Sequence, residues 1–150
     1  MKIPPDQWHK QVPAKVTALV DEGIKDLVEV LNTFDGVRTF ESCQGHPGDL
    51  AIIYADYGEE CRKPFEGSKH FDILTHFVNK LVKSVRKYGR MNDVDMSVIW
   101  MGTSGFPVIC VTLPRNAIDE VTKIISLVHA KFECDKLKKA KEEKNDTKNS

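Results

Sequence analysis

Apolar residues recur at helical spacing in three stretches of the chain. The first covers residues 14–34, the second begins at Phe71 and ends near Gly89, and the third runs from Asn116 to about Phe132. In each stretch the apolar positions lie three or four residues apart, which places them on one face of a helix. The spacing therefore predicts three amphipathic helices.

Four shorter stretches have the composition of β-strands. They are rich in β-branched and aromatic residues and cover residues 37–43, 50–57, 94–101 and 106–113. The connection within each pair of strands is short enough for antiparallel pairing. The order α-ββα-ββα predicts an α+β fold, with one four-stranded, mostly antiparallel sheet and three helices on one of its faces.

The chain has 150 residues, enough for one domain with a single core. Residues 1–13 are Pro-rich and expected to be irregular, and residues 14–135 make up the α+β domain. Residues 136–150 lose the apolar stripe and become charged and polar, so we expect this tail to be disordered.

The charge of the chain and the search for targeting signals do not change the predicted fold. The 22 basic and 22 acidic residues balance, so no general attraction to nucleic acid or membrane is expected, although a local basic patch stays open. No secretory signal and no apolar run of membrane-spanning length is found, which predicts a soluble cytoplasmic protein with no membrane partner. The cysteines are widely spaced and are expected to be thiols, and the oligomeric state is left open.

The candidate functional residues lie in the segment FESCQGHPGD, residues 40–49, at the end of the first predicted strand. Glycines let backbone amides approach an anion or a nucleotide closely, and the neighbouring polar side chains supply further hydrogen bonds. The segment therefore predicts a pocket for a small-molecule, nucleotide-like ligand, with a plain Gly-Pro turn as the alternative. The candidate ligand-binding residues are Glu41, Ser42, Gln44, Gly45, His46 and Gly48.

Nucleophilic catalysis and metal binding are further alternatives for this segment. The sequence therefore leaves open whether the protein is an enzyme. Cys43 is a candidate nucleophile if His46 activates its thiol, and otherwise a strand-end cysteine that packs inward. A zinc-stabilised domain is a further alternative, with Cys43, His46, Cys61 and His70 as ligands. Because Cys61 and His70 are spread over a loop rather than a tight turn, we expect no metal.

The stretch LVEVLNTFDGVRTFESCQGHPGD, residues 27–49, resembles the entry segment of the tRNA wybutosine-synthesis methyltransferase family. In that family a helix leads into a strand that closes on Ser-Cys, a polar residue and Gly. The matching residues here are Leu27, Val28, Leu31, Asn32, Thr39, Ser42, Cys43 and Gly45. The later stretch VIWMGTSGFPVICVTLPRNAIDEVTKII is similar to that family's strand, turn, strand and helix. The resemblance implies S-adenosylmethionine as cofactor, RNA as a partner and methyl transfer as the reaction.

The segment departs from that family at His46, where the family tends to carry an arginine. A Ser-Cys-x-Gly-His signature also resembles small bacterial and phage proteins, to which this chain is closer in length. That second resemblance implies a non-catalytic binding or regulatory module. Trp8, Tyr57 and Trp100 are candidate stacking surfaces for a base, although we expect Trp100, in the third strand, to lie in the core.

Overall fold

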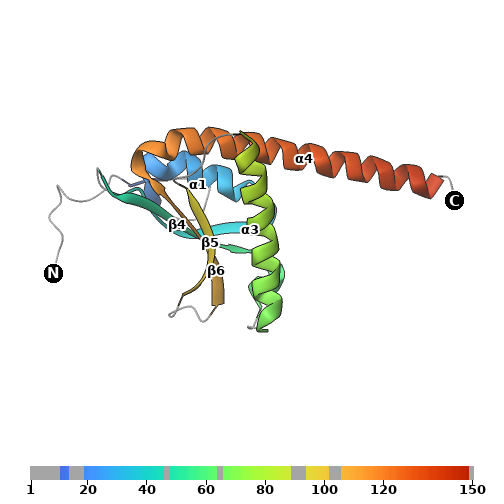
Figure 1. Cartoon of the computed structure of the whole chain (residues 1–150), viewed down its shortest axis with the longest axis horizontal. Coiled ribbons are helices and arrows are strands. Elements are labelled where there is room, and N and C mark those ends of the chain that lie inside the picture. The colour runs from blue at the N-terminus through green and yellow to red at the C-terminus, as the bar shows by residue number, and fades with distance from the viewer. Residues whose placement is uncertain are drawn as a thin grey trace.

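The computed structural model describes residues 11–13, 19–45, 48–63, 66–88, 94–101 and 106–148, and it confirms the α+β class (Figure 1). All strand pairs of its four-stranded sheet are antiparallel. The order across the sheet is β3-β4-β6-β5, so β3 and β5 are the edges. The strands are β3 (Val37–Cys43), β4 (Leu50–Tyr57), β5 (Asp95–Met101) and β6 (Phe106–Pro114).

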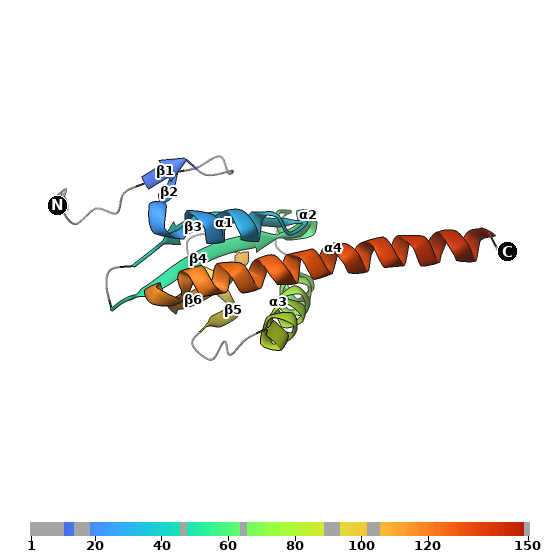
Figure 2. The same ribbon diagram turned by 90° about the horizontal axis from the view of Figure 1, so that it is seen from above.

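Three long helices cover one face of this sheet, with α4 running between α1 and α3 (Figure 2). A one-turn helix, α2 (Gly58–Cys61), follows β4, and short 3-10 turns precede α1 and α4. None of the helices in the described ranges combines the length and apolarity that a membrane span requires. The long helices are α1 (Lys25–Asn32), α3 (Ser68–Tyr88) and α4 (Ile118–Lys148).

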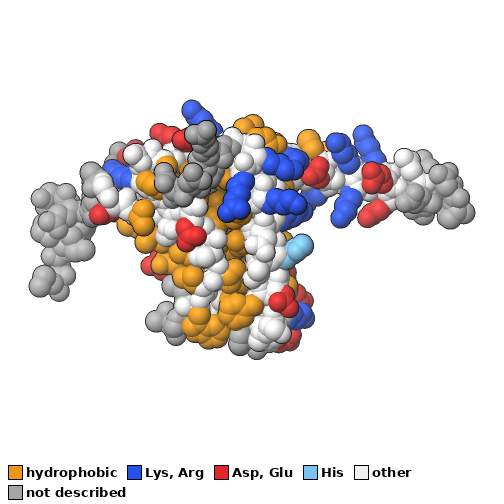
Figure 3. All heavy atoms as spheres, in the orientation of Figure 1, with side chains coloured by type: hydrophobic (Ala, Val, Ile, Leu, Met, Phe, Trp, Pro, Cys, Tyr) orange, Lys and Arg blue, Asp and Glu red, His pale blue; other side chains and the backbone are white. Residues whose placement is uncertain are grey.

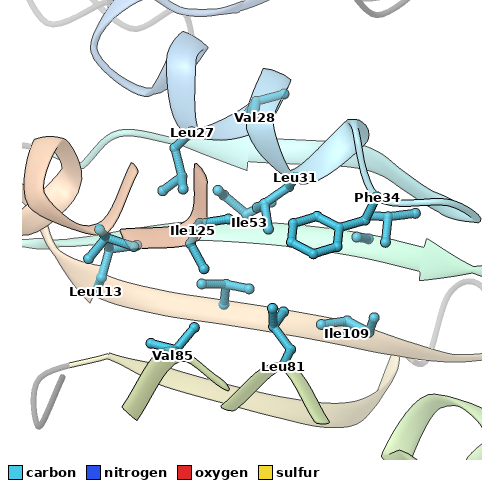
Figure 4. Packing of buried hydrophobic residues seen from close by; sticks show 14 of the residues in the cluster. Leu27, Val28, Leu31, Phe34, Ile53, Leu81, Val85, Ile109, Leu113 and Ile125 are labelled. Atoms are coloured by element: carbon cyan, nitrogen blue, oxygen red, sulfur yellow. The ribbon is translucent and has the colours of Figure 1, made fainter. Parts of the chain in front are cut away.

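One hydrophobic core fills the space between the sheet and the helices. Alternate residues of β4, namely Ala51, Ile53 and Ala55, are buried beneath the helical layer, as the two-residue period of a strand requires. Figure 4 shows the side chains that meet them from α1, α3, α4 and β6. They include Leu27, Val28, Leu31, Leu81, Val85, Ile109, Leu113 and Ile125.

The first helix begins later than its apolar spacing predicts. Residues Leu19–Asp21 form a strand, β2, which pairs antiparallel with β1 (Gln11–Pro13), and α1 begins only at Lys25. The predictions of a helix from residue 14 and of an irregular segment through residue 13 are therefore wrong for these residues. The physical reason is that the Asp21 carboxylate and the Gly23 backbone N–H both bind Gln44, at the end of β3. Residues 1–10 and 14–18 lie outside the described ranges.

The last helix extends further than predicted. α4 continues to Lys148, so the tail from residue 136, which the sequence predicts to be disordered, is helical over all of its described length. The segment contains no Gly or Pro, and its Lys, Glu, Ala and Leu residues have high helix propensity. Helical propensity alone accounts for this part of α4, because it projects beyond the sheet and the other helices (Figure 1).

Two neighbouring residues of α4 test which face of the helix is buried. Ile125 is fully buried, whereas Leu127 is 54% exposed. Ile125→Ala leaves a cavity in the core, so we expect the free energy of unfolding to fall by about 2–5 kcal/mol. Leu127→Ala is the control and should change it by no more than about 0.5 kcal/mol. Urea denaturation measures both, and equal losses would contradict this orientation of α4.

Candidate functional site

Gln44 fastens the end of β3 to the chain that enters α1. Its side chain is largely buried, and its Oε1 accepts a hydrogen bond from the Gly23 N–H at 2.7 Å. Its own backbone N–H donates to Oδ2 of Asp21 at 3.0 Å. We call these two hydrogen bonds the Gln44 clasp. Gln44, which the sequence predicts to bind a ligand, is thus already engaged by the fold.

The two glycines of the loop have different surroundings. Both have positive φ, 75° at Gly45 and 87° at Gly48. A Cβ at Gly45 would lie 2.7 Å from the carbonyl oxygen of Leu50, whereas a Cβ at Gly48 would meet no atom within 4 Å. Gly45 is therefore required where the end of β3 passes the start of β4. Gly48 instead borders a surface depression, together with Asp49, Leu50, Pro114, Arg115 and Asn116.

The other candidate residues of the loop lie on different sides of the sheet. Ser42 pairs with the buried Ile53 and lies on the helix-covered face, whereas Cys43 pairs with Ile52 and is exposed on the opposite face. Glu41 is exposed as well. His46 lies outside the described residues, so neither activation of Cys43 by His46 nor a ligand pocket at residues 42–48 is tested. Both stay predictions.

The structure separates Cys43 from Cys61 and His70, the three described residues of the zinc alternative, and His46 lies outside the described residues. Cys43 pairs with Ile52, whereas Cys61 follows Tyr57 at the other end of β4. Ile52 and Tyr57 are five strand residues apart. At about 3.3 Å per residue, the two cysteines are separated by roughly 17 Å, which is too far for a shared ion. Cys61 does lie near His70, with its Sγ 4.0 Å from the His70 carbonyl oxygen, and burial raises the pKa of the Cys61 thiol. Within the described ranges no group of three or more His, Cys, Asp or Glu side chains is placed to hold a metal.

An aromatic pair joins the first turn of α3 to the edge strand β5. The rings of Phe71 and Trp100 are stacked, with centroids 6.3 Å apart and planes 17° apart. Trp100 is 50% exposed, so the expectation that it lies in the core is wrong. The physical reason is that β5 is an edge strand, and no further strand covers its outer side.

A basic groove lies further along α3, beside the start of β5, and we call it the α3–β5 groove. Three exposed cations from the last two turns of α3, Lys83, Arg86 and Lys87, line it beside Met96 of β5. No acidic side chain is among its lining residues, and none of the three cations forms an ion pair with another described residue. The Asp95 carboxylate borders an adjoining hollow with Arg86. Figure 3 shows Lys and Arg side chains gathered at this end of α3, above hydrophobic side chains.

Comparison with known proteins adds no relative. No model of a protein family, no curated protein and no solved structure matches the chain. The likeness to wybutosine-synthesis methyltransferases therefore stays a resemblance carried by residues 27–49. The geometry of the fold and its surfaces is the basis for assigning a function.

Loss of the Gln44 clasp should lower the stability of the fold. Gln44→Ala removes the acceptor for the Gly23 N–H and the packing of a buried side chain, so we expect a loss of about 1–3 kcal/mol in the free energy of unfolding. Hydrogen exchange at the Gly23 amide should accelerate as well. Glu41→Ala, in the same strand but exposed, is the control and should stay within about 0.5 kcal/mol of wild type. An unchanged unfolding midpoint in Gln44→Ala would show that the clasp does not stabilise the fold.

Gly45 and Gly48 form a matched pair for a second stability measurement. Alanine at either position incurs the cost of a positive φ, about 1–2 kcal/mol. Only Gly45→Ala adds a collision with the Leu50 carbonyl, so it should destabilise the protein clearly more than Gly48→Ala does. Thermal and urea denaturation of the two variants measure the difference. Equal destabilisation would mean that β3 and β4 do not approach closely here.

Proposed function

We propose that the protein binds single-stranded nucleic acid along the α3–β5 groove. One observation carries this proposal: α3 and β5 hold between them both the stack of Phe71 on the half-exposed Trp100 and, further along α3, a groove lined by three cations without described acidic partners. Aromatic rings stack on bases of any sequence, and Lys and Arg neutralise phosphates. Their combination in one groove is typical of proteins that bind single strands with little sequence preference.

The distance from the aromatic stack to the end of the α3–β5 groove suits a short strand. Phe71 and Lys87 are 16 residues apart on α3, which corresponds to about 24 Å along the helix. A strand of about four nucleotides, the lower end of known site sizes, can span this distance. We expect a base to stack on Trp100 while phosphates further along the strand contact the three cations Lys83, Arg86 and Lys87.

The charge of the whole chain bears on affinity. Its formal net charge is zero, so attraction to a polyanion comes from the local cluster on α3 and not from the protein as a whole. We therefore expect moderate affinity that falls steeply with added salt. Because stacking and phosphate contacts carry no sequence information, we also expect little discrimination among bases.

This proposal requires binding only and does not depend on a reaction. Methyl transfer with S-adenosylmethionine, which the resemblance implies, stays a prediction without support from the described residues. Binding of a nucleotide-like ligand at residues 42–48 also stays a prediction. Gln44 and Gly45 have structural roles at the end of β3, and His46 is not described. Of the functions that the sequence suggests, RNA binding is the one to which the groove lends support.

Charge removal at the groove tests the proposal. The triple variant Lys83→Ala, Arg86→Ala, Lys87→Ala should bind a fluorescent 12-nucleotide single strand at least about tenfold more weakly at low salt. Its slope of log affinity against log salt should be smaller by about 2, since each phosphate contact contributes about 0.7. Trp100→Ala should lose the stacking contribution of about 1–3 kcal/mol. Fluorescence anisotropy measures all of these, and thermal denaturation checks that each variant is folded.

The matched control removes the same charge from the exposed end of α4. Lys138→Ala, Lys139→Ala, Lys141→Ala should leave both affinity and salt dependence near wild type. Equal losses in the two triple variants would show that general charge, and not the groove, holds the strand. Full competition by polyglutamate, together with wild-type binding by Trp100→Ala, would instead assign the groove to an acidic polypeptide.

A further inference from the structure

The side of α3 that faces away from the groove borders a second cavity, of about 490 Å³. Its walls come from the turn after α1, the end of β4, and helices α3 and α4. We call it the aromatic pocket, because its apolar lining is mainly Phe34, Tyr57, Phe77 and Phe132. Its volume falls within the range of about 300–1,000 Å³ typical of small-molecule sites.

The rings of the aromatic pocket contact one another in a fixed arrangement. Tyr57 and Phe77 are stacked, with centroids 4.1 Å apart and planes 15° apart. Phe34 packs edge-on against Phe132, at a centroid distance of 5.4 Å, and against Phe77, at 6.2 Å. Since Phe34 and Phe77 are buried, they form the floor, and the contacts among the rings fix the shape of the pocket. A lining of this kind is complementary to a flat, aromatic ligand.

One ion pair closes the rim between α4 and the turn after α1. Lys136 donates a hydrogen bond to Asp35, and its Nζ lies 3.5 Å from Oε1 of Glu133. The hydrogen bond lowers the pKa of the Asp35 carboxyl and raises the pKa of the Lys136 ammonium. Both groups are therefore charged at neutral pH, and the positive charge of Lys136 is largely neutralised by its two acidic neighbours.

The remaining polar groups of the rim come from α3 alone. Asp72, His76 and Lys80 lie four residues apart, so they follow one another along one face of the helix over about 12 Å. None of them forms an ion pair with another residue in the described part of the chain. Lys80 lies over the Phe132 ring, with its Nζ 4.8 Å from the ring centroid. The pocket thus offers a cation at one end of its rim and a carboxylate at the other.

The geometry points to a ligand with a planar heteroaromatic ring and an anionic tail, and among such molecules to a nucleoside monophosphate. The ring lies against the aromatic lining, the phosphate accepts hydrogen bonds from Lys80, and the Asp72 carboxylate accepts from amino or hydroxyl groups at the other end. An aromatic cation fits less well, because Lys80 already occupies the face of Phe132 and repels a second positive charge. The proposal does not rest on nucleic-acid binding in the groove, since the apolar linings of the two sites lie on different flanks of the buried stripe of α3.

Two lysines of the same helix provide the test. Lys80 borders the aromatic pocket and Lys83 borders the groove, and both are exposed. Isothermal titration calorimetry of the full chain with adenosine monophosphate should show binding in wild type and in Lys83→Gln. In Lys80→Gln the affinity should fall about tenfold, the effect of one lost charge-assisted hydrogen bond to phosphate. Adenosine, which lacks the phosphate, should bind wild type and Lys80→Gln equally.

A second variant tests the ring contacts. Phe132→Leu keeps an apolar side chain but removes a wall of the pocket, so it should weaken adenosine and adenosine monophosphate by the same factor. Oligonucleotide binding should be unaffected by Phe132→Leu and by Lys80→Gln, which separates this site from the groove. The assignment is overturned if none of the four common nucleoside monophosphates binds, or if Lys80→Gln and Lys83→Gln lose equal affinity. Binding of indole-3-acetate that is tighter than that of every monophosphate would overturn the choice of phosphate over carboxylate.

Discussion

Burial of one face of the sheet beneath three helices is the interaction on which the other features depend. Each strand carries apolar side chains on this face, and α1, α3 and α4 supply the residues that exclude water from it. Three helices of unequal length cannot cover four strands evenly. The places where they do not meet closely, beside α3, become the groove and the aromatic pocket. Both candidate sites are therefore products of core packing, and not additions to a finished fold.

Helix α3 shows how one element serves a core and two surfaces. Its buried stripe, which includes Leu74, Phe77, Leu81 and Val85, fixes the position and rotation of the helix. With that rotation fixed, the residues on either side of the stripe can only point toward β5 or toward α4. The cations of the last two turns also lie where the helix dipole favours positive charge, so they stabilise α3 even without a ligand. A side chain can thus have a structural role and be available for binding.

The sequence predicts those parts of the structure that follow from local periodicity. The four strands and the apolar faces of α3 and α4 belong to this class, because a two- or 3.6-residue repeat is visible within one segment. The start of α1 does not, since it is set by Gln44, which lies 21 residues from Gly23 in the chain. The aromatic pocket could not be predicted either, because Phe34, Tyr57, Phe77 and Phe132 come from four different elements. The exposure of Trp100 is not predicted for a similar reason: the sequence predicts its strand, but the position of that strand at the sheet edge depends on the order of all four strands.

The length of α4 has a mechanical consequence. Lys136 is the last residue of the helix with a described ion pair to another element, and 12 further residues extend about 18 Å beyond it. A change in the contact between Lys136 and Asp35 would alter the angle at which the residues after Lys136 leave the domain. A rotation of about 10° there displaces the tip of the helix by about 3 Å, given that length. The length of α4 would therefore turn a small change in the width of the aromatic pocket into a larger displacement of the last described residues of the helix.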